Sequence, residues 1–243
     1  MSLGSDGRAF ADLHCHTSAS FDSLARPRDV VRAAAARGLT HLAITDHERL
    51  DGALEARDGA PEGLTVIVGE EIRVQEGDLI GLFLTEAVPP GLSMAEAIRS
   101  IRAQGGLVGV PHPFDRFRSS LGRVAALESV ASELDWIEVH NARVVGGGGN
   151  QRAAEFAYDA GLPGVAVSDA HSVLEVGVAY TAFDGDPGTP DGLLDALASA
   201  EIVPGRASYV ARVWTPAAKV VQRLRGNRRI TAAASGEPGE EPV

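Results

Sequence analysis

The sequence predicts an α/β protein built around a parallel sheet, and three features of the chain indicate this fold class. Short runs of apolar and β-branched residues recur about seven times along the chain. Segments with helix start and stop signals lie between most of these runs. The runs are continuous rather than alternating in hydrophobicity, as expected for strands that are buried on both faces. Strands that alternate with helices pair in parallel, and a chain of 243 residues suits a single domain of this kind.

The expected strands share this apolar composition, and they cover residues 9–13, 41–45, 64–68, 79–84, 106–110, 136–139 and 164–167. The interval between the third and fourth strands leaves little room for a helix. Pro27 near the start and Gly38 just past the end mark the first helix. Ser93 and Glu96 form a capping-box pair that begins another helix. Further helices are expected over residues 121–134, 150–160 and 190–198.

Polar side chains follow at least six of the expected strands at the point where each strand ends. They are His14 and His16, Asp46 and His47, Glu70 and Glu71, His112, Asn141, and Asp169 and His171. The carboxyl ends of parallel strands meet at one edge, whether the sheet is open or closed into a barrel. The pattern therefore predicts one functional site assembled from separate loops.

Histidine nitrogens and carboxylate oxygens together suit Zn²⁺, Mn²⁺ or Fe²⁺. His14 and His16 are two apart, so in a strand both side chains reach the same side, and Asp169 and His171 repeat this spacing. Cys15 then points the other way, and we assign it to packing. Asp46 is interpreted as the hydrogen-bond partner that fixes the tautomer of its neighbour His47.

The candidate ligands number about eight, and they are His14, His16, Asp22, His47, one of Glu70 and Glu71, His112, Asp169 and His171. One tetrahedral ion takes four ligands, so the set predicts two or three ions, with the glutamate bridging two of them. Two close metal ions suit hydrolysis by a metal-activated hydroxide, which requires no covalent protein nucleophile.

Two arginines and an asparagine are candidates for substrate binding. Arg118 and Arg143 follow the ends of two strands, where a guanidinium can hold a phosphate group, although either can also be an ordinary surface arginine. Asn141 and His140 are adjacent in a strand, so their side chains point to opposite faces of the sheet and only one can face the centre. We expect it to be Asn141. His41 begins a strand, at the wrong end of the sheet, and is interpreted as structural.

The overall composition limits the classes of function. The net charge of −11 and the pI near 5.1 argue against a protein that coats nucleic acid. The single cysteine and the absence of a signal sequence or a spanning apolar run favour a soluble cytoplasmic protein without membrane association or an obligate protein partner. Residues 233–243 form a polar tail that is expected to be disordered. The basic run at 212–229 is interpreted as a solvated helix face rather than a phosphate site.

Five motifs together resemble the PHP family, named for polymerase and histidinol phosphatase. They occur in the family's order, as DLHCHTSASFD, AITDH, GEEI, PHP and SDAH. The resemblance implies a distorted (β/α)7 TIM-like barrel over residues 8–232, with a di- or trinuclear centre of Zn, Mn or Fe. It selects Glu71 over Glu70 and implies the other seven ligands as above. Asn141 and Arg143 resemble positions near the substrate in short, stand-alone members. Asp78 stands where many members have a further histidine, so the third ion is open.

The expected function is that of a metal-dependent phosphoesterase. Its substrate would be a small phosphorylated metabolite, a nucleotide or the end of an oligonucleotide, and the sequence leaves this choice open. One alternative is a metal-dependent amide or ester hydrolase, because the same hydroxide can attack a carbonyl. A second alternative is a non-catalytic module that the metal only stabilises.

Overall fold

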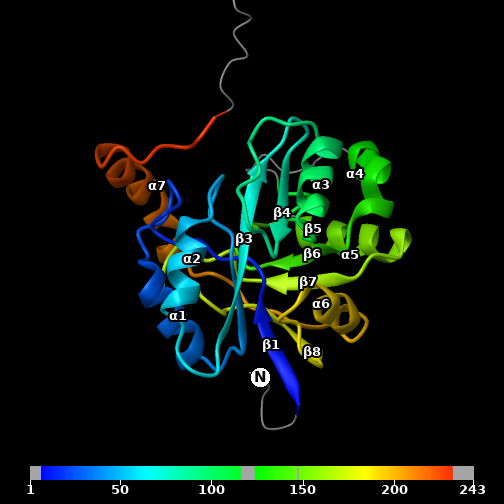
Figure 1. Ribbon diagram of the computed structural model, residues 1–243, viewed down its shortest axis with the longest axis horizontal. Helices are drawn as coiled ribbons and strands as arrows, with labels where there is room; N and C mark the ends of the chain where they lie inside the picture. Colours follow the sequence, from blue (N-terminus) through cyan, green and yellow to red (C-terminus); the bar gives the residue numbers. More distant parts are fainter. Residues whose placement is uncertain (1–6, 116–123, 147, 232–243) are drawn as a thin grey trace, which may run out of the picture.

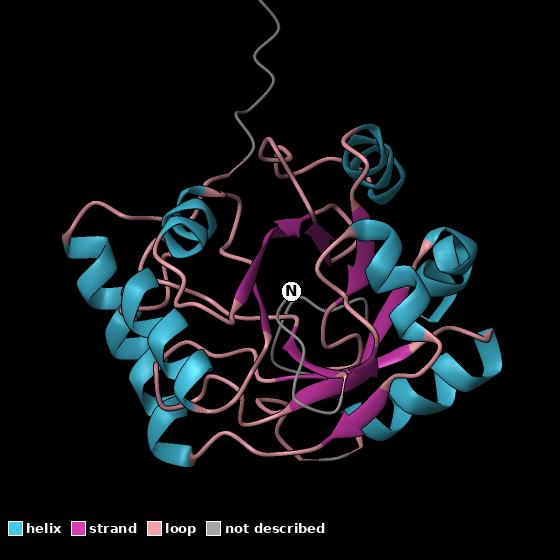
Figure 2. Ribbon diagram, turned by 60° about the horizontal axis from the view of Figure 1, so that its bottom comes forward, coloured by secondary structure: helices cyan, strands magenta, loops and turns pink. Residues whose placement is uncertain are grey.

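A computed structural model of the chain describes residues 7–115, 124–146 and 148–231. Its strands form one mixed sheet that curves into an almost closed barrel, with the helices around the outside (Figure 2). The strands are β1 Arg8–Asp12, β2 His41–Ile44, β3 Thr65–Arg73, β4 Asp78–Leu82, β5 Leu107–Val110, β6 Trp136–Asn141, β7 Gly164–Val167, β8 Tyr180–Asp184 and β9 Glu201–Val203. The helices are α1 Pro27–Ala36, α2 Asp51–Asp58, α3 Met94–Ala103, α4 Val124–Val130, α5 Gly149–Ala160, α6 Pro190–Leu197 and α7 Tyr209–Leu224, with a 3₁₀ turn at Ala131–Glu133.

The strand order is β7-β6-β5-β4-β3-β2-β1-β8-β9, and the expectation of an all-parallel sheet was wrong, because β4 and β8 run in the opposite direction to the other strands. β4 is antiparallel to both β3 and β5, and β8 is antiparallel to β1 and to β9. Only residues 74–77 join β3 to β4, which is too short for the crossover that a parallel pair requires. The sequence did not predict β8 and β9, because β8 mixes hydroxyl and charged side chains with its apolar residues and β9 has only three residues, the first of them charged.

The barrel closes where the chain beyond β1 meets the chain beyond β7. The amide of Asp169 donates to the carbonyl of His14 at 2.9 Å, and the amide of His16 donates to the carbonyl of Ala170 at 2.8 Å. Cys15 and Ala170 form an isolated parallel bridge at the same place. This seam therefore brings the pair His14 and His16, after β1, beside the pair Asp169 and His171, after β7.

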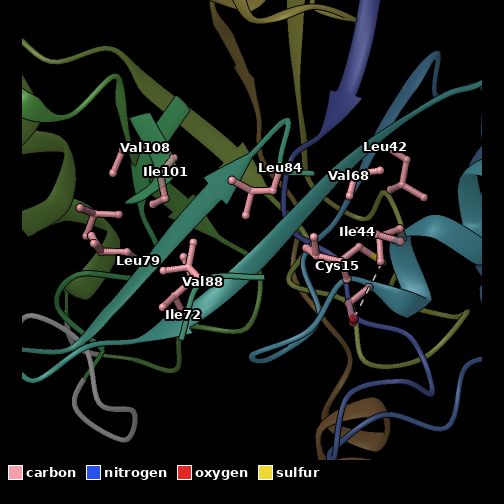
Figure 3. Packing of buried hydrophobic residues seen from close by; sticks show 14 of the residues in the cluster. Cys15, Leu42, Ile44, Val68, Ile72, Leu79, Leu84, Val88, Ile101 and Val108 are labelled. Carbon is pink, nitrogen blue, oxygen red and sulfur yellow. Dashed lines mark hydrogen bonds between the residues drawn. The ribbon is translucent and has the colours of Figure 1, made fainter. Parts of the chain in front are cut away.

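Buried apolar side chains form two clusters, one on each face of the sheet. Alternate residues of β1 divide between them: Ala9 and Ala11 belong to one cluster and Phe10 packs against the other. In Figure 3, Cys15 lies in the same group of apolar side chains as Ile44 and Val68, as its assignment to packing requires. The strands are thus buried on both faces, which explains their continuous hydrophobicity.

The helices largely follow their sequence signals. Pro27 begins α1, and the Ser93–Glu96 capping box begins α3 with both of its reciprocal hydrogen bonds. The structure adds α2, which the sequence did not predict, and places α7 in the basic run (orange in Figure 1). The first part of the helix expected at 121–134 and the tail at 233–243 lie outside the described residues. Within the described part of the chain, no helix combines the length and hydrophobicity needed to cross a membrane.

Candidate metal centre

The structure brings all eight candidate ligands together at the C-terminal end of the barrel strands. They converge from five strand ends and one loop, and the set comprises His14, His16, Asp22, His47, Glu71, His112, Asp169 and His171. Seven of these side chains are no more than 5% exposed, and His47 is 10% exposed. Such burial is costly for polar groups unless they are paired with one another or with a bound cation.

The first group of donors lies at the seam of the barrel and consists of His14, His16, Asp169 and Glu71. The two histidine Nε2 atoms are 2.9 Å apart, and each lies 3.3 Å from Oε2 of Glu71. Oδ1 of Asp169 lies 3.8 Å from Nε2 of His14 and 3.6 Å from Nε2 of His16. Four donor atoms therefore point into one small buried space.

The second group adjoins the first and contains Asp22, His47 and His171, with His16 shared between the groups. Oδ2 of Asp22 lies 3.4 Å from Nε2 of His47 and 3.3 Å from Nε2 of His171. The ring of His16 lies against both imidazoles, with centroids 4.8 Å from His47 and 4.3 Å from His171. The loop after β1 therefore contributes a carboxylate to a mainly imidazole site.

Glu71 connects the two groups and extends to His112. Its Oε2 is 3.3 Å from Nδ1 of His47 as well as from the first group, and its Oε1 is 3.2 Å from Nε2 of His112. Glu70 points away, since its Oε2 accepts a hydrogen bond from the amide of Val88. The strand alternation thus separates the two neighbouring glutamates, and Glu71 has the position of a bridging ligand.

The spacing of the donors fits transition-metal ions. Bond lengths of about 2.0–2.2 Å in a tetrahedral site put neighbouring donor atoms about 3.3–3.6 Å apart. The distances from Glu71 to His14, His16 and His47, and from Asp22 to His171, are all 3.3 Å. Donor type and donor spacing therefore agree with the predicted binding of divalent ions.

The electrostatic field around His14 and Glu71 favours positive charge. Burial alone would lower the pKa of His14, but nearby carboxylates, Glu138 first among them, raise it well above its ordinary value. For the acid Glu71 burial acts in the opposite direction and would raise the pKa. The neighbouring His47 and His14 outweigh this effect and hold the pKa of Glu71 well below its usual range. A site that draws a proton onto a buried imidazole stabilises a metal cation in the same place.

Glu138 supports the ligands from behind, and the sequence analysis did not single it out. Its Oε1 lies 2.6 Å from Nδ1 of His14, and its Oε2 accepts hydrogen bonds from the amide of His112 and from Nδ2 of Asn141. Asn141 donates a second hydrogen bond to Oδ2 of Asp169 at 3.0 Å. Asn141 therefore orients a candidate ligand, and its predicted contact with substrate stays a prediction.

The interpretation of Asp46 as the partner of His47 was wrong. Both carboxylate oxygens of Asp46 accept hydrogen bonds from Thr17, one from its amide and one from its hydroxyl, each at 2.6 Å. Asp46 is fully buried and so fastens the loop after β1 to the end of β2. Parity could have indicated this, because neighbouring residues at a strand end face opposite sides.

Unusual backbone conformations concentrate at the centre. Glu48, His112 and Asp169 have φ values of +54°, +29° and +53°, a region that residues other than glycine rarely adopt. Two of the three are candidate ligands, and Glu48 directly follows a third. Strain of this kind is held in place by the surrounding structure, as in preorganised functional sites.

A cavity of about 510 Å³ opens onto the ligands and is lined by cationic side chains. Arg143 lies in its wall, where its guanidinium pairs with the buried Glu175 at 2.5 Å and with Oγ1 of Thr215 at 2.7 Å. Lys219 and Arg229 also line it, so the interpretation of the basic run as only a solvated face was wrong for these two residues. Arg118 lies outside the described residues.

The remaining predicted positions lie away from the ligands or at the edge of the cavity. Nε2 of His140 contacts the carbonyl of Gly205 at 2.8 Å, and His41 pairs with Asp186 at the opposite end of the barrel. Asp78 begins β4, as the sequence reading favoured, and its carboxylate pairs with Nε of Arg73 at 3.1 Å. It nevertheless lines the cavity, and its predicted role as a possible further ligand stays a prediction.

Comparison with solved structures supports the barrel fold. A two-domain protein from Bacteroides vulgatus, described as containing a predicted PHP-like metal-dependent phosphoesterase, superposes with a TM-score of 0.68 at 20% identity. The superposition covers 82% of this chain and 65% of that protein, so this chain spans slightly less than two thirds of its length. At this level of identity, the likeness concerns the fold.

Sequence comparison identifies the family. An uncharacterised protein of Methanocaldococcus jannaschii is 40% identical over 144 residues, which cover 54% of this chain and 81% of that protein. A 5'-3' exoribonuclease of Haemophilus influenzae is 31% identical over 117 residues, covering 43% of this chain and 42% of that protein. A model of the PHP domain matches residues 12–124 and a PHP-associated model matches residues 147–202. Since the first range holds every ligand from His14 to His112 and the second holds Asp169 and His171, the chain belongs to the PHP domain family.

Proposed function

We propose that this protein is a phosphoesterase that hydrolyses phosphate esters with two or three divalent ions of Mn, Zn or Fe. The observation that carries the proposal is that metal-ligating and cationic side chains line one cavity. Membership of the PHP family supports the coarser statement that the chain is a metal-dependent hydrolase. The cations favour a phosphate over the neutral group of an amide or ester.

When bound, the ions supply a water nucleophile at neutral pH and stabilise the charge that gathers on a transferring phosphoryl group. The protein's own part is to fix the donors. Glu71 sets the separation of the two ligand groups, Glu138 holds the tautomer of His14, and Asn141 orients Asp169. Because these groups are buried and hydrogen-bonded, the donor geometry is set before substrate arrives.

Lys219 is the cation best placed to contact a phosphate. Its Nζ lies 4.0 Å from Oδ2 of Asp22, and its side chain is 51% exposed. Arg143 and Arg229, in contrast, pair closely with the buried Glu175 and Glu48. Asp22 would lose its negative charge if it held a metal ion, and the ammonium group of Lys219 would then be available for an anionic substrate.

The cavity volume of about 510 Å³ suits a small phosphorylated metabolite or a nucleotide. The similarity to an exoribonuclease favours a second candidate, removal of nucleotides from the end of an oligonucleotide. The two differ in how they respond to salt. Hydrolysis of an oligonucleotide falls steeply as salt rises, whereas hydrolysis of a mononucleotide does not.

The test is hydrolysis by the purified protein with Mn²⁺ of two substrates: p-nitrophenyl phosphate, followed by release of p-nitrophenol, and a 5′-phosphorylated dinucleotide, followed by separate assays for mononucleotide and for inorganic phosphate. We expect hydrolysis that EDTA abolishes and that Glu71→Gln lowers by at least 100-fold. Hydrolysis of p-nitrophenyl acetate without any phosphoester hydrolysis would instead support the ester-hydrolase alternative. Two or three ions per chain with neither activity would support the non-catalytic alternative.

A further inference from the structure

The loop that carries Asp22 is held by the C-terminal end of the chain. We call residues 215–229, which comprise most of α7 and the residues after it, the closing segment. It lies beyond both matched ranges, the second of which ends at residue 202. Four of its residues line the cavity beside the ligands, namely Thr215, Pro216, Lys219 and Arg229. The closing segment is therefore part of the site although neither family model covers it.

Gln222 is the centre of this contact. Its side-chain amide Nε2 donates to the carbonyls of Ser18, Ser20 and Ser23, at 2.8, 3.0 and 2.6 Å. The side chain is only 2% exposed, so water cannot easily replace it. Three carbonyl oxygens that converge on one point repel each other unless a donor lies between them. The Gln222 amide is the nearest such donor, and Nδ2 of Asn227 reaches the carbonyls of Ser18 and Ser20 only at 3.4 Å, so the shape of the loop depends mainly on Gln222.

Asn227 and Arg229 attach the same end of the chain at two further points. Nδ2 of Asn227 donates to the carbonyl of Ala19 at 2.9 Å. The guanidinium of Arg229 donates to Oε1 of Glu48 through Nε at 3.0 Å and through Nη2 at 2.7 Å. Glu48 directly follows the ligand His47. The closing segment thus contacts the neighbourhoods of two ligands of the second group.

A direct link runs from Gln222 to Asp22. Ser20 receives the Gln222 hydrogen bond on its carbonyl and donates its hydroxyl to Oδ1 of Asp22 at 2.7 Å. Oδ1 is then fixed, and Oδ2 is the atom that faces His47 and His171. The position of the ligating oxygen therefore follows the position of the Gln222 amide.

We infer that Gln222 is a positioning residue of the metal centre, which holds the Asp22 loop so that the second group of donors can bind its ion. The inference rests on the metal centre of the proposed function, but it concerns one ion only. The first group takes its donors from the barrel seam and β3, and among the described residues the Gln222 side chain hydrogen-bonds to the Asp22 loop and not to that group. Loss of the amide should weaken the second group selectively.

The test compares Gln222→Met with Gln151→Met. Methionine keeps the length of glutamine and removes the amide. Gln151 is exposed on α5, and among the described residues its side chain donates within its own helix, to Glu155, so it is a matched control. Both variants and the unaltered chain are dialysed against a series of buffered free Mn²⁺ concentrations, and bound metal is counted by inductively coupled plasma mass spectrometry.

We expect Gln222→Met to bind one ion at least ten-fold more weakly, with the remaining ions and the Gln151→Met control unchanged. Asp22→Asn, which alters the ligand itself, should weaken the same ion. A Gln222→Met protein that matches the unaltered chain at every Mn²⁺ concentration would overturn the inference. Equal weakening of all ions would also overturn it, because that result indicates general loosening of the barrel.

If Gln222→Met does not fold, as judged by circular dichroism, Ser20→Ala replaces it. That variant removes the hydroxyl that links the loop to Asp22 and leaves the Gln222 amide in place, so the same single ion should weaken. A Ser20→Ala protein with unchanged binding contradicts the inference. An unaltered chain that binds no Mn²⁺, Zn²⁺ or Fe²⁺ overturns both proposals, whereas one that binds metal without hydrolysing phosphoesters overturns only the proposed function.

Discussion

Replacement of Glu138 by glutamine tests whether the ligands depend on the residue behind them. Oε1 of Glu138 accepts the Nδ1 proton of His14, which leaves Nε2 of that histidine with a lone pair for a metal ion. Oε2 accepts two further hydrogen bonds, from the amide of His112 and from Nδ2 of Asn141. A carboxylate is suited to this position because all three neighbours are donors.

Glutamine cannot reproduce this pattern in either orientation. If its carbonyl replaces Oε2, its NH₂ group faces Nδ1 of His14 and forces the proton onto Nε2, which can then no longer bind metal. If its carbonyl faces His14, the NH₂ group opposes two donors, and two hydrogen bonds worth roughly 1 kcal/mol each are lost. Either outcome costs about 1.4–3 kcal/mol, which corresponds to about 10–100-fold in metal affinity.

The assay is competition for Zn²⁺ against a chromogenic chelator at constant pH, with Glu155→Gln as the matched control. Glu155 is exposed on α5, and its one side-chain hydrogen bond within the described part of the chain comes from Gln151. We expect Glu138→Gln to lose affinity and Glu155→Gln to retain it. Affinity of Glu138→Gln within two-fold of the unaltered chain would refute the reasoning, because it would show that the tautomer of His14 is fixed without the carboxylate.

Three further changes have defined outcomes. Lys219→Met should raise the KM for p-nitrophenyl phosphate about ten-fold with little change in kcat. The control variant Arg223→Met, at an exposed position of α7, should leave KM unchanged. Steady-state kinetics at fixed ionic strength would measure both. Burial raises the pKa of Glu70 from 4.5 to about 8, so the folded state holds this proton more tightly and loses stability as the pH rises from about 4.5 through about 8. Glu70→Gln keeps an acceptor for the amide of Val88 and should raise the free energy of unfolding by on the order of 3 kcal/mol in urea melts at pH 8, with a smaller gain at pH 6. Dialysis at pH 5 should release metal that is retained at pH 7.5, because ligating imidazoles must be neutral; full retention at pH 5 would contradict the histidine-rich centre.

The sequence predicted the parts of the fold that depend on local signals. Pro27 and the Ser93–Glu96 pair mark helix ends because capping is determined within one turn of helix. The antiparallel β4 and the strands β8 and β9 depend on pairing with distant strands, which no local pattern encodes. The short interval before β4 was the one available indication that it could not be parallel.

In the site too, the features that depend on local sequence were predicted, and those that depend on distant contacts were missed. The two-apart spacing of His14 and His16 predicted their convergence, because strand alternation is local. Glu138 was missed because it lies inside a strand, where a buried glutamate gives no signal without knowledge of its neighbours. Lys219 was missed because a basic helix has the same composition whether it faces solvent or a cavity. Only the packing of α7 against the loop after β1 shows that it faces the cavity.

Because the seam joins distant parts of the chain, it also determines when during synthesis the metal site can be completed. Residues on its two sides, such as Cys15 and Ala170, are 155 positions apart, and closing a loop of that length costs about 4–5 kcal/mol of chain entropy. At translation rates of roughly 5–20 residues per second, the last ligands emerge about 10–30 s after the first. During this interval the two leading histidines lack the partners that would give them high affinity. A metal ion at this seam would therefore be held with full affinity only after both sides of the seam have been made.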